Sequence, residues 1–177
     1  ASLILQEAQP GQSALDIGTG SGCIAVSLAL EGLQVTAMDI SADALRIAGG
    51  NASMLQADVE LVQEDILHPA SSNQQWDIIV SNPPYIRHME AGDMEATVLE
   101  HEPHTALFVP DSDPLLFYRA IGQYAWEHLG SQGKLWFEIN REFHRETCQL
   151  LEGFGFTGIE ARKDFYDNYR FVKATRP

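Results

Sequence analysis

The four residues Asn82-Pro83-Pro84-Tyr85 have the types and the order that could hold a planar nitrogen group for chemistry. The NH2 of a carboxamide or an aromatic amine is a poor nucleophile because its lone pair is delocalised. An enzyme that methylates it must place acceptors against both hydrogens. The Asn82 side-chain oxygen is one acceptor, the Pro83 carbonyl is a second, and Tyr85 can lie against the flat face. Consecutive prolines fix the direction of that carbonyl, since each holds φ at about −65° and restricts the preceding residue.

The apolar run 76–81 leads directly into this tetrapeptide. A short β-branched run bounded by prolines predicts a buried strand, and open α/β sheets bind ligands at the carboxyl ends of their strands. We therefore expect the tetrapeptide in an active site. A Pro-Pro turn that merely ends a strand is the structural alternative. The flanking Asn and Tyr favour the functional interpretation, provided that the chain also holds a methyl donor.

A glycine-rich turn, Gly18, Gly20 and Gly22, lies between a predicted strand at 13–17 and a predicted apolar helix at 23–30. A strand, a glycine turn and a helix form the first half of a nucleotide-binding crossover. Position 23 is Cys, so the dinucleotide fingerprint is incomplete, and no Lys-Ser or Lys-Thr follows to make a phosphate-binding Walker loop. A glycine turn alone is also typical of tight strand-to-helix packing.

Three acids at successive strand ends strengthen the case for a donor site: Asp16, Asp39 and Asp65. Asp39 lies about 20 residues beyond the glycine turn, where an acid accepts hydrogen bonds from ribose hydroxyls. Asp65 is placed to accept from an adenine amino group, and Ile66 could pack on the ring. Asp16 could orient the turn or receive the ammonium of a methionine moiety. S-adenosylmethionine fits these acids, because it has a ribose, an adenine and a cationic sulfonium. It has no phosphate, and a phosphate-containing cofactor would favour basic groups or an open helix N-terminus.

The order of predicted elements indicates an α/β fold. We predict strands at 13–17, 35–39, 59–63, 76–81, 134–139, 158–162 and 169–174, and helices at 23–30, 115–129 and 141–151. A further helix follows an N-cap at Ser41 and runs toward Gly49-Gly50-Asn51 or to Met54, and Gly130 and Gly133 flank a turn. Alternation implies a doubly wound, mostly parallel sheet. The last two strands are too close in sequence for a helical crossover and should be antiparallel. A Rossmann-like seven-stranded sheet with an antiparallel closing strand is the methyltransferase version of this architecture. The long segment 86–114 is interpreted as a substrate-side lid.

Composition limits the function classes. The 177 residues suffice for one domain, of which 45% are apolar and 20% charged. A membrane span needs a run of about 20 apolar residues, and the sequence contains no such run and no signal-peptide pattern, so we expect a cytoplasmic protein. The net charge of −14 weighs against an extended nucleic-acid surface and favours a basic protein partner.

The residues that could bind metal do not form a convincing site. Cys23 and Cys148 lack ligand spacing and are predicted to be buried thiols in helices. The stretch His101-Glu102-Pro103-His104 contains a proline that disrupts the helix needed to bring both histidines to one face. We expect no metal.

Several motifs together closely resemble the peptide chain release factor glutamine N5-methyltransferases. They are Asp16-Ile17-Gly18-Thr19-Gly20-Ser21-Gly22-Cys23-Ile24-Ala25, Gly50-Asn51-Ala52, Ser81-Asn82-Pro83-Pro84-Tyr85-Ile86, Glu102-Pro103 with Ala106-Leu107-Phe108, and Leu116-Phe117-Tyr118-Arg119-Ala120-Ile121. The resemblance covers nearly the whole chain. Asn-Pro-Pro-Tyr is shared with adenine N6 and other amino-methyltransferases, whereas the Glu-Pro and Tyr-Arg blocks are more specific to the glutamine enzymes.

The resemblance implies methylation of the glutamine side-chain amide in the Gly-Gly-Gln motif of class I release factors, with S-adenosylmethionine as cofactor and S-adenosylhomocysteine as product. The expected donor-binding residues are Asp16, Gly18, Thr19, Gly20, Gly22, Asp39, Ile40, Asn51, Asp65, Ile66 and Asn82. The expected substrate-binding residues are Asn82, Pro83, Pro84 and Tyr85, of which Asn82, Pro83 and Tyr85 are the catalytic set. We expect residues 1–177 to form one catalytic domain, to be monomeric, and to lack the family's amino-terminal helical domain. Asn140 departs from the family, which usually has Gly there.

Three alternatives stay open. The acceptor could be the exocyclic amine of adenine in RNA or DNA, flipped into the same site. The chain could be a non-catalytic S-adenosylmethionine-binding or scaffold domain. A nicotinamide-dependent dehydrogenase is disfavoured by Cys23 at the third glycine position of the fingerprint.

Overall fold

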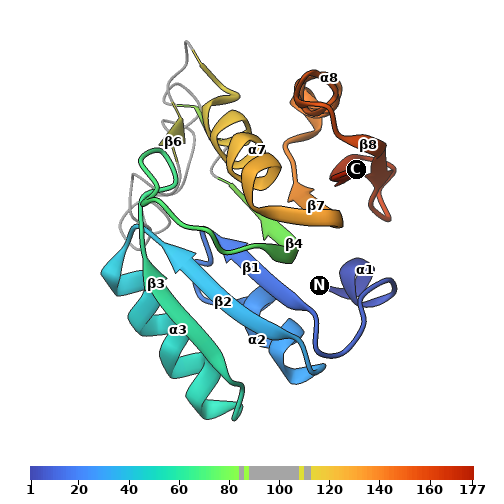
Figure 1. Cartoon of the computed structure of the whole chain (residues 1–177). Helices are drawn as coiled ribbons and strands as arrows, with labels where there is room; N and C mark the ends of the chain where they lie inside the picture. Colours follow the sequence, from blue (N-terminus) through green and yellow to red (C-terminus); the bar gives the residue numbers. More distant parts are fainter. Residues whose placement is uncertain (84–85, 88–107, 110–112) are drawn as a thin grey trace.

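The computed structural model describes residues 1–83, 86–87, 108–109 and 113–177 (Figure 1). The strands are β1 (Ser13–Ile17), β2 (Gln34–Asp39), β3 (Val59–Gln63), β4 (Trp76–Ser81), β5 (Ile86–Arg87), β6 (Phe108–Val109), β7 (Leu129–Glu138), β8 (Thr157–Lys163) and β9 (Tyr169–Thr175). The helices are α1 (Ser2–Leu5), α2 (Cys23–Leu30), α3 (Ala42–Met54), α7 (Leu116–His128) and α8 (His144–Phe154), with a 3-10 turn η1 (Arg141–Phe143).

Seven strands form one sheet in the order β3-β2-β1-β4-β7-β9-β8. The pairs from β3 to β7 are parallel, whereas β9 runs antiparallel to both of its neighbours. The predicted Rossmann-like sheet with an antiparallel closing strand is therefore confirmed. The strand order reverses between β1 and β4, which is where doubly wound sheets bind their ligands.

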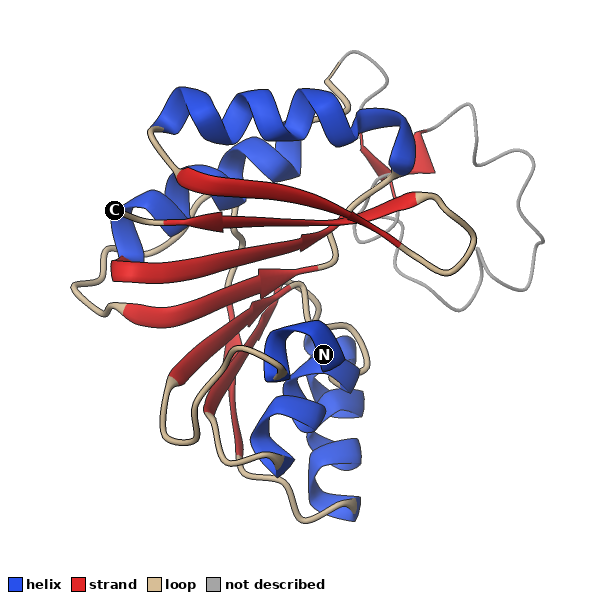
Figure 2. Cartoon of the chain, turned by 90° about the vertical axis from the view of Figure 1, so that its right-hand side faces the viewer, coloured by secondary structure: helices blue, strands red, loops and turns tan. Residues whose placement is uncertain are grey.

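Helices cover both faces of this sheet (Figure 2). The helices α2 and α3 pack on one face against β1, β2 and β3, and α7 and α8 pack on the other against β4, β7, β8 and β9. Side chains of β1 alternate accordingly: Leu15 and Ile17 enter the core beneath α7 and α8, and Ala14 enters the core beneath α2. Burial on both faces explains why these strands are continuously apolar in the sequence.

The parallel strands deliver three loops to one edge of the sheet. Gly18 follows β1, Ile40 follows β2 and Asn82 follows β4, and all three strands run in the same direction. In the register of the sheet, Ile17 pairs with both Met38 and Ser81, so the three loops begin side by side.

Two predictions about local structure were wrong. The turn expected at Gly130 and Gly133 is an irregularity inside β7, where Trp76 pairs with Leu129 but Ile78 pairs with Lys134. The second concerns Cys23, which is exposed rather than buried because it occupies the first turn of α2 at the edge of the sheet. Cys148 is only partly buried, since α8 packs just one side against the core.

The expected lid at 86–114 lies mostly outside the described residues. Its described parts include β5 and β6, which form a short parallel pair with Ile86 opposite Phe108. Within the described ranges the longest helices, α3 and α7, have 13 residues each, and none qualifies as a membrane span.

Candidate active site

The loop after β1 is held in a conformation that only glycine adopts easily. Gly18, Gly20 and Gly22 have φ values of +73°, +57° and +81°, in the left-handed region that penalises a Cβ. The backbone N–H groups of Gly18 and Thr19 both donate to the Met38 carbonyl oxygen, at 2.8 and 3.0 Å. The loop is therefore fastened to the end of β2 before α2 begins.

Gly18 and Gly20 differ from Gly22 in what surrounds them. A Cβ at Gly22 would lie 2.8 Å from the Ala48 Cβ, so this glycine permits α3 to approach the loop. A Cβ at Gly18 or Gly20 would meet no atom within 4 Å. The open space beside these two glycines leaves room for a ligand to lie against the backbone.

Asp39 binds the same loop from the end of β2. Its carboxylate accepts hydrogen bonds from the N–H groups of Gly20 and Ser41, each at 2.9 Å, and the residue is buried. An ionised carboxylate has about four acceptor positions, so those left over can accept from further donors. Ser41 in turn caps α3 by accepting from the Ala44 N–H at 3.1 Å.

Asp16 lies inside the protein beneath the loop. It is 1% exposed, and its carboxylate accepts a hydrogen bond from the Thr19 hydroxyl at 2.8 Å. Burial raises the pKa of Asp16 to about 6; the Thr19 hydrogen bond opposes the rise and the nearby Asp39 carboxylate adds to it. Of the two roles considered for Asp16, orienting the turn fits this buried position.

The other expected donor-binding residues lie on three different segments: α3, the end of β2 and the turn after β3. Asn51, in α3, donates from its side-chain amide to the Ser21 carbonyl oxygen at 2.8 Å and so supports the loop. Ile40 is 44% exposed directly after β2 and offers an apolar surface. The Asp65 carboxylate accepts from the Leu67 N–H at 2.9 Å, and Ile66 is buried in the core. The expected contacts of Asp65 and Ile66 with an adenine ring stay predictions.

The expected substrate-binding residues follow the neighbouring strand, β4. Asn82 is exposed and Pro83 is buried immediately beyond β4, while Pro84 and Tyr85 lie outside the described residues. Adjacent strands are about 4.8 Å apart, so the chain that leads to Asn82 starts one strand away from Gly18. An exposed Asn82 can present its amide oxygen to a substrate beside the glycine loop.

Ser81 links the ends of β4 and β1, a contact that the sequence did not suggest. Its hydroxyl donates to the Ile17 carbonyl oxygen at 2.6 Å, and the side chain is buried. The signal that could have revealed it is a hydroxyl at the end of an otherwise apolar strand, directly before Asn82.

The Asn140 side chain makes a contact that Gly could not make at this position. Its side-chain oxygen accepts from the Glu142 N–H at 3.0 Å and caps η1, and its backbone N–H donates to the Tyr118 hydroxyl at 3.3 Å. Tyr118 is fully buried, and Arg119 forms a two-bond ion pair with Asp113 at 2.9 and 3.0 Å. Tyr118 therefore packs in the core, and Arg119 forms an ion pair nearer the surface.

The charge of the site suits a cation better than a phosphate. Residues 16–22, 39–41 and 81–83 contain two aspartates but no lysine or arginine. In the part of the chain that the structure describes, no cluster of three or more His, Cys, Asp or Glu could bind a metal. The stretch His101-Glu102-Pro103-His104 lies outside that part.

Comparison with known proteins gives the family. The model of the methyltransferase small domain family matches residues 1–107. A release factor glutamine methyltransferase from Flavobacterium psychrophilum is 48% identical over 161 residues, which cover 90% of this chain and 56% of that protein. The protein of the same name from Bacteroides thetaiotaomicron is 43% identical over 177 residues, covering 98% and 64%. The chain thus spans less than two thirds of the length of these relatives.

Solved structures agree on the fold. A methyltransferase from Pyrococcus furiosus superposes with a TM-score of 0.73 at 18% identity, covering 99% of this chain and 80% of that one. The 16S rRNA N2 G1207 methyltransferase from Thermus thermophilus gives 0.71 at 18% identity, covering 99% and 41%. The expected resemblance to release factor glutamine methyltransferases is confirmed by the sequence relatives, and the chain belongs to the methyltransferase small domain family.

Proposed function

We propose that the chain is one catalytic domain that transfers a methyl group from S-adenosylmethionine to the glutamine side-chain amide in the Gly-Gly-Gln motif of class I release factors. The observation that carries the proposal is the exposed Asn82 at the end of β4, one strand from the glycine loop. The relatives named release factor glutamine methyltransferase support the choice of substrate. Such a substrate implies a cytoplasmic enzyme, which we propose acts as a monomer.

The residues present suit this donor. Asp39 has acceptor positions beyond those that bind Gly20 and Ser41, as ribose hydroxyls require. The open space over Gly18 and Gly20 accommodates a ligand against the loop, and no basic side chain in the loop segments favours a phosphate. When bound, S-adenosylmethionine supplies an electrophilic methyl group on a positively charged sulfur.

Asn82 and Pro83 hold the acceptor in this proposal. The Asn82 side-chain oxygen and the Pro83 carbonyl accept the two N–H hydrogens of the glutamine amide, which turns the nitrogen lone pair toward the donor. Each neutral hydrogen bond contributes about 1 kcal/mol net, whereas alignment of two reactants can supply about 7 to 11 kcal/mol. Positioning therefore accounts for most of the expected rate enhancement. As the nitrogen gains the methyl group it becomes strongly acidic, so it can release one N–H proton to water without a strong general base.

Mass spectrometry tests the proposal directly. The chain is incubated with S-adenosylmethionine and an intact class I release factor, and the peptide that contains Gly-Gly-Gln is sequenced by fragmentation. We expect the mass of one added methylene group on the glutamine side chain. A parallel reaction offers total RNA with a labelled donor. Label in RNA adenine with an unmodified release factor would favour the nucleic-acid alternative, and no transfer to either would favour a non-catalytic binding domain.

A further inference from the structure

The turn between β8 and β9 places two adjacent aromatic side chains in solvent. Phe165 is fully exposed and Tyr166 is 86% exposed. Single exposed apolar residues are common on protein surfaces, but adjacent large ones on a protruding turn are typical of interaction sites. The two residues together offer a sizeable apolar surface that the described part of the chain does not cover.

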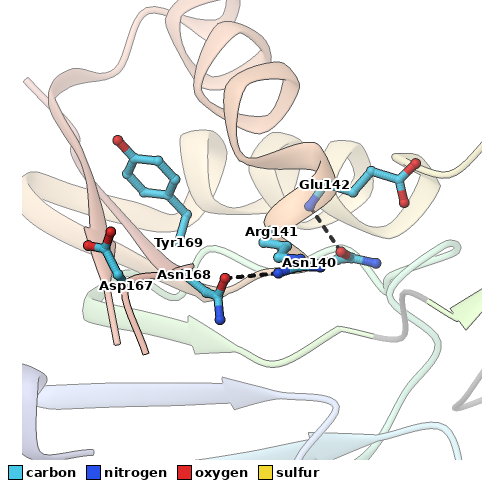
Figure 3. A pocket seen from close by; sticks show the side chains of 6 residues that line it. All are labelled: Asn140, Arg141, Glu142, Asp167, Asn168 and Tyr169. Atoms are coloured by element: carbon cyan, nitrogen blue, oxygen red, sulfur yellow. Dashed lines mark hydrogen bonds between the residues drawn. The ribbon is translucent and has the colours of Figure 1, made fainter. Parts of the chain in front are cut away.

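Hydrogen bonds hold this turn in one conformation. The Asp164 carboxylate accepts from the N–H groups of Tyr166 and Asn168, at 2.9 and 3.1 Å, and from the Arg170 guanidinium at 3.2 Å. Asn168 also accepts from the Arg141 guanidinium at 2.9 Å, which ties the turn to η1 (Figure 3). A surface that is already ordered loses little conformational entropy on binding.

The turn lies at the same edge of the sheet as the acceptor loop. Lys163 pairs with Tyr169 at the base of the turn, and in the register of the sheet Phe137 lies between Ser81 of β4 and Val172 of β9. Two strand spacings, about 10 Å, therefore separate β9 from the strand that leads to Asn82. An open hollow of about 600 Å³ adjoins the turn, lined by Asn140, Arg141, Glu142, Asp167, Asn168 and Tyr169 (Figure 3).

The charges around the turn favour a protein over a nucleic acid. Lys163 pairs with Asp167 at 3.3 Å, and Arg170 and Arg141 are bonded to Asp164 and Asn168. Two of these three cations, Lys163 and Arg170, are paired with carboxylates, whereas Arg141 is bonded to a neutral amide. A single unpaired cation at this turn offers little to a phosphate backbone. The carboxylates of Glu142 and Asp167 line the hollow, and the whole chain carries a net charge of −14. The exposed aromatic pair on a strongly acidic chain suits a partner that presents an apolar side chain on a basic surface.

We propose that the β8–β9 turn and this hollow form the docking surface for the protein that carries the target glutamine, an inference that rests on the proposed function. Phe165 and Tyr166 pack against an apolar side chain of the release factor, and the acidity of the whole chain favours a basic surface around that side chain. Because β9 lies about two strand spacings from β4, a partner docked on this turn would lie at the same edge of the sheet as Asn82.

The test compares two double variants. Phe165→Ser with Tyr166→Ser removes the aromatic pair, and Met54→Ser with Leu55→Ser removes exposed apolar side chains where α3 ends, at the opposite edge of the sheet. KM and kcat are measured for an intact release factor and for a short Gly-Gly-Gln peptide. Because aromatic contacts dominate many interfaces, we expect the first variant to raise KM for the release factor by about tenfold or more. Its kcat, the peptide kinetics and the donor affinity should not change, and the second variant should match the wild type.

Three results would overturn the inference. One is an unchanged KM for the release factor in the aromatic variant, and another is an equal loss toward the short peptide. The third is sedimentation of the wild type, but not of the aromatic variant, with phosphatidylglycerol vesicles, which would assign the turn to membranes. A wild-type chain that methylates no release factor refutes the proposed function itself, whereas an active wild type with an equally active aromatic variant refutes only the docking surface.

Discussion

The Ser81 hydroxyl donates a hydrogen bond to the Ile17 carbonyl oxygen, at 2.6 Å and inside the core, where the ends of β4 and β1 pair. One of these strands leads to Asn82 and the other to Gly18. The bond therefore fixes the chain that leads to Asn82 relative to the chain that leads to the glycine loop. A displacement of about 1 Å between reacting groups can cost a factor of about 100 in rate.

Replacing Ser81 by Ala should lower kcat by about tenfold or more and leave donor affinity nearly unchanged. The variant loses this buried hydrogen bond, which also costs about 1 kcal/mol of stability. Steady-state kinetics, donor calorimetry and urea unfolding separate the three effects.

Ser13 provides the matched control. It joins the same two strands at the opposite edge of the sheet, where its hydroxyl accepts from the Asp77 N–H at 3.0 Å. Ser13→Ala should lower stability by about 1 kcal/mol without changing kcat. Equal losses of kcat in the two variants would show that Ser81 acts only through stability.

Asn82→Ala should reduce turnover by about 100-fold or more, because the substrate amide loses an acceptor that orients it. Donor affinity, measured by isothermal titration calorimetry, should stay close to that of the wild type. Asn82 is exposed, so the free energy of unfolding of the variant should also differ little from that of the wild type. Asn73→Ala, at an exposed position between β3 and β4, controls for the loss of an amide. Unaltered turnover in the Asn82 variant removes this residue from the mechanism.

Asp39→Ala should weaken donor binding by about tenfold or more, since a carboxylate contributes about 1.5 to 3 kcal/mol through charged hydrogen bonds. The change also frees the N–H groups of Gly20 and Ser41. Asp43→Ala is the comparison, because Asp43 is an exposed acid in the first turn of α3 with only a 3.9 Å pair to Arg46. Donor affinity is measured by calorimetry for both variants. Equal affinities would refute the proposed contact between Asp39 and the ribose of the donor.

Much of this fold was readable from local sequence. The apolar strands, the glycine turn after residue 17, the Ser41 cap of α3 and the antiparallel closing pair were all predicted, because each depends on side chains close together in the chain. The positions of Asp16, Asp39 and Asn82 at one edge also followed, since parallel strands share their direction.

The remainder depends on partners far apart in the sequence. Ser81 and Ile17 are 64 positions apart, and Asn51 and Ser21 are 30 positions apart, so no local pattern could pair them. The exposure of Cys23 was missed because an apolar stretch does not show which turn of its helix reaches the edge of the sheet. The irregularity within β7 arises from its pairing with β4, whereas two nearby glycines suggest a turn.

The glycines of the donor loop should differ in their tolerance of a side chain. Gly20→Ala meets no atom within 4 Å and carries only the left-handed backbone penalty, about 1 to 2 kcal/mol. Gly22→Ala carries the same penalty and also places its Cβ 2.8 Å from that of Ala48, so its total cost should be about 2 to 5 kcal/mol. Urea unfolding without donor measures both. Equal costs would mean that α3 can move away from the loop freely.

Asp16 should make stability fall as pH rises from about 4 to 6. Its pKa is about 6 in the folded chain against an ordinary 3.8, mainly because of burial, so the folded state retains a proton that the unfolded state releases. This retained proton contributes about 3 kcal/mol to the free energy of unfolding below the lower pKa. The contribution decreases as pH rises and is lost above the higher pKa. Asp16→Asn removes the titrating carboxyl group. The free energy of unfolding of the variant, relative to that of the wild type, should therefore increase from about pH 4 to about pH 6. Asp58→Asn, at an exposed position, controls for the lost charge; parallel stability curves for wild type and Asp16→Asn would contradict the assignment.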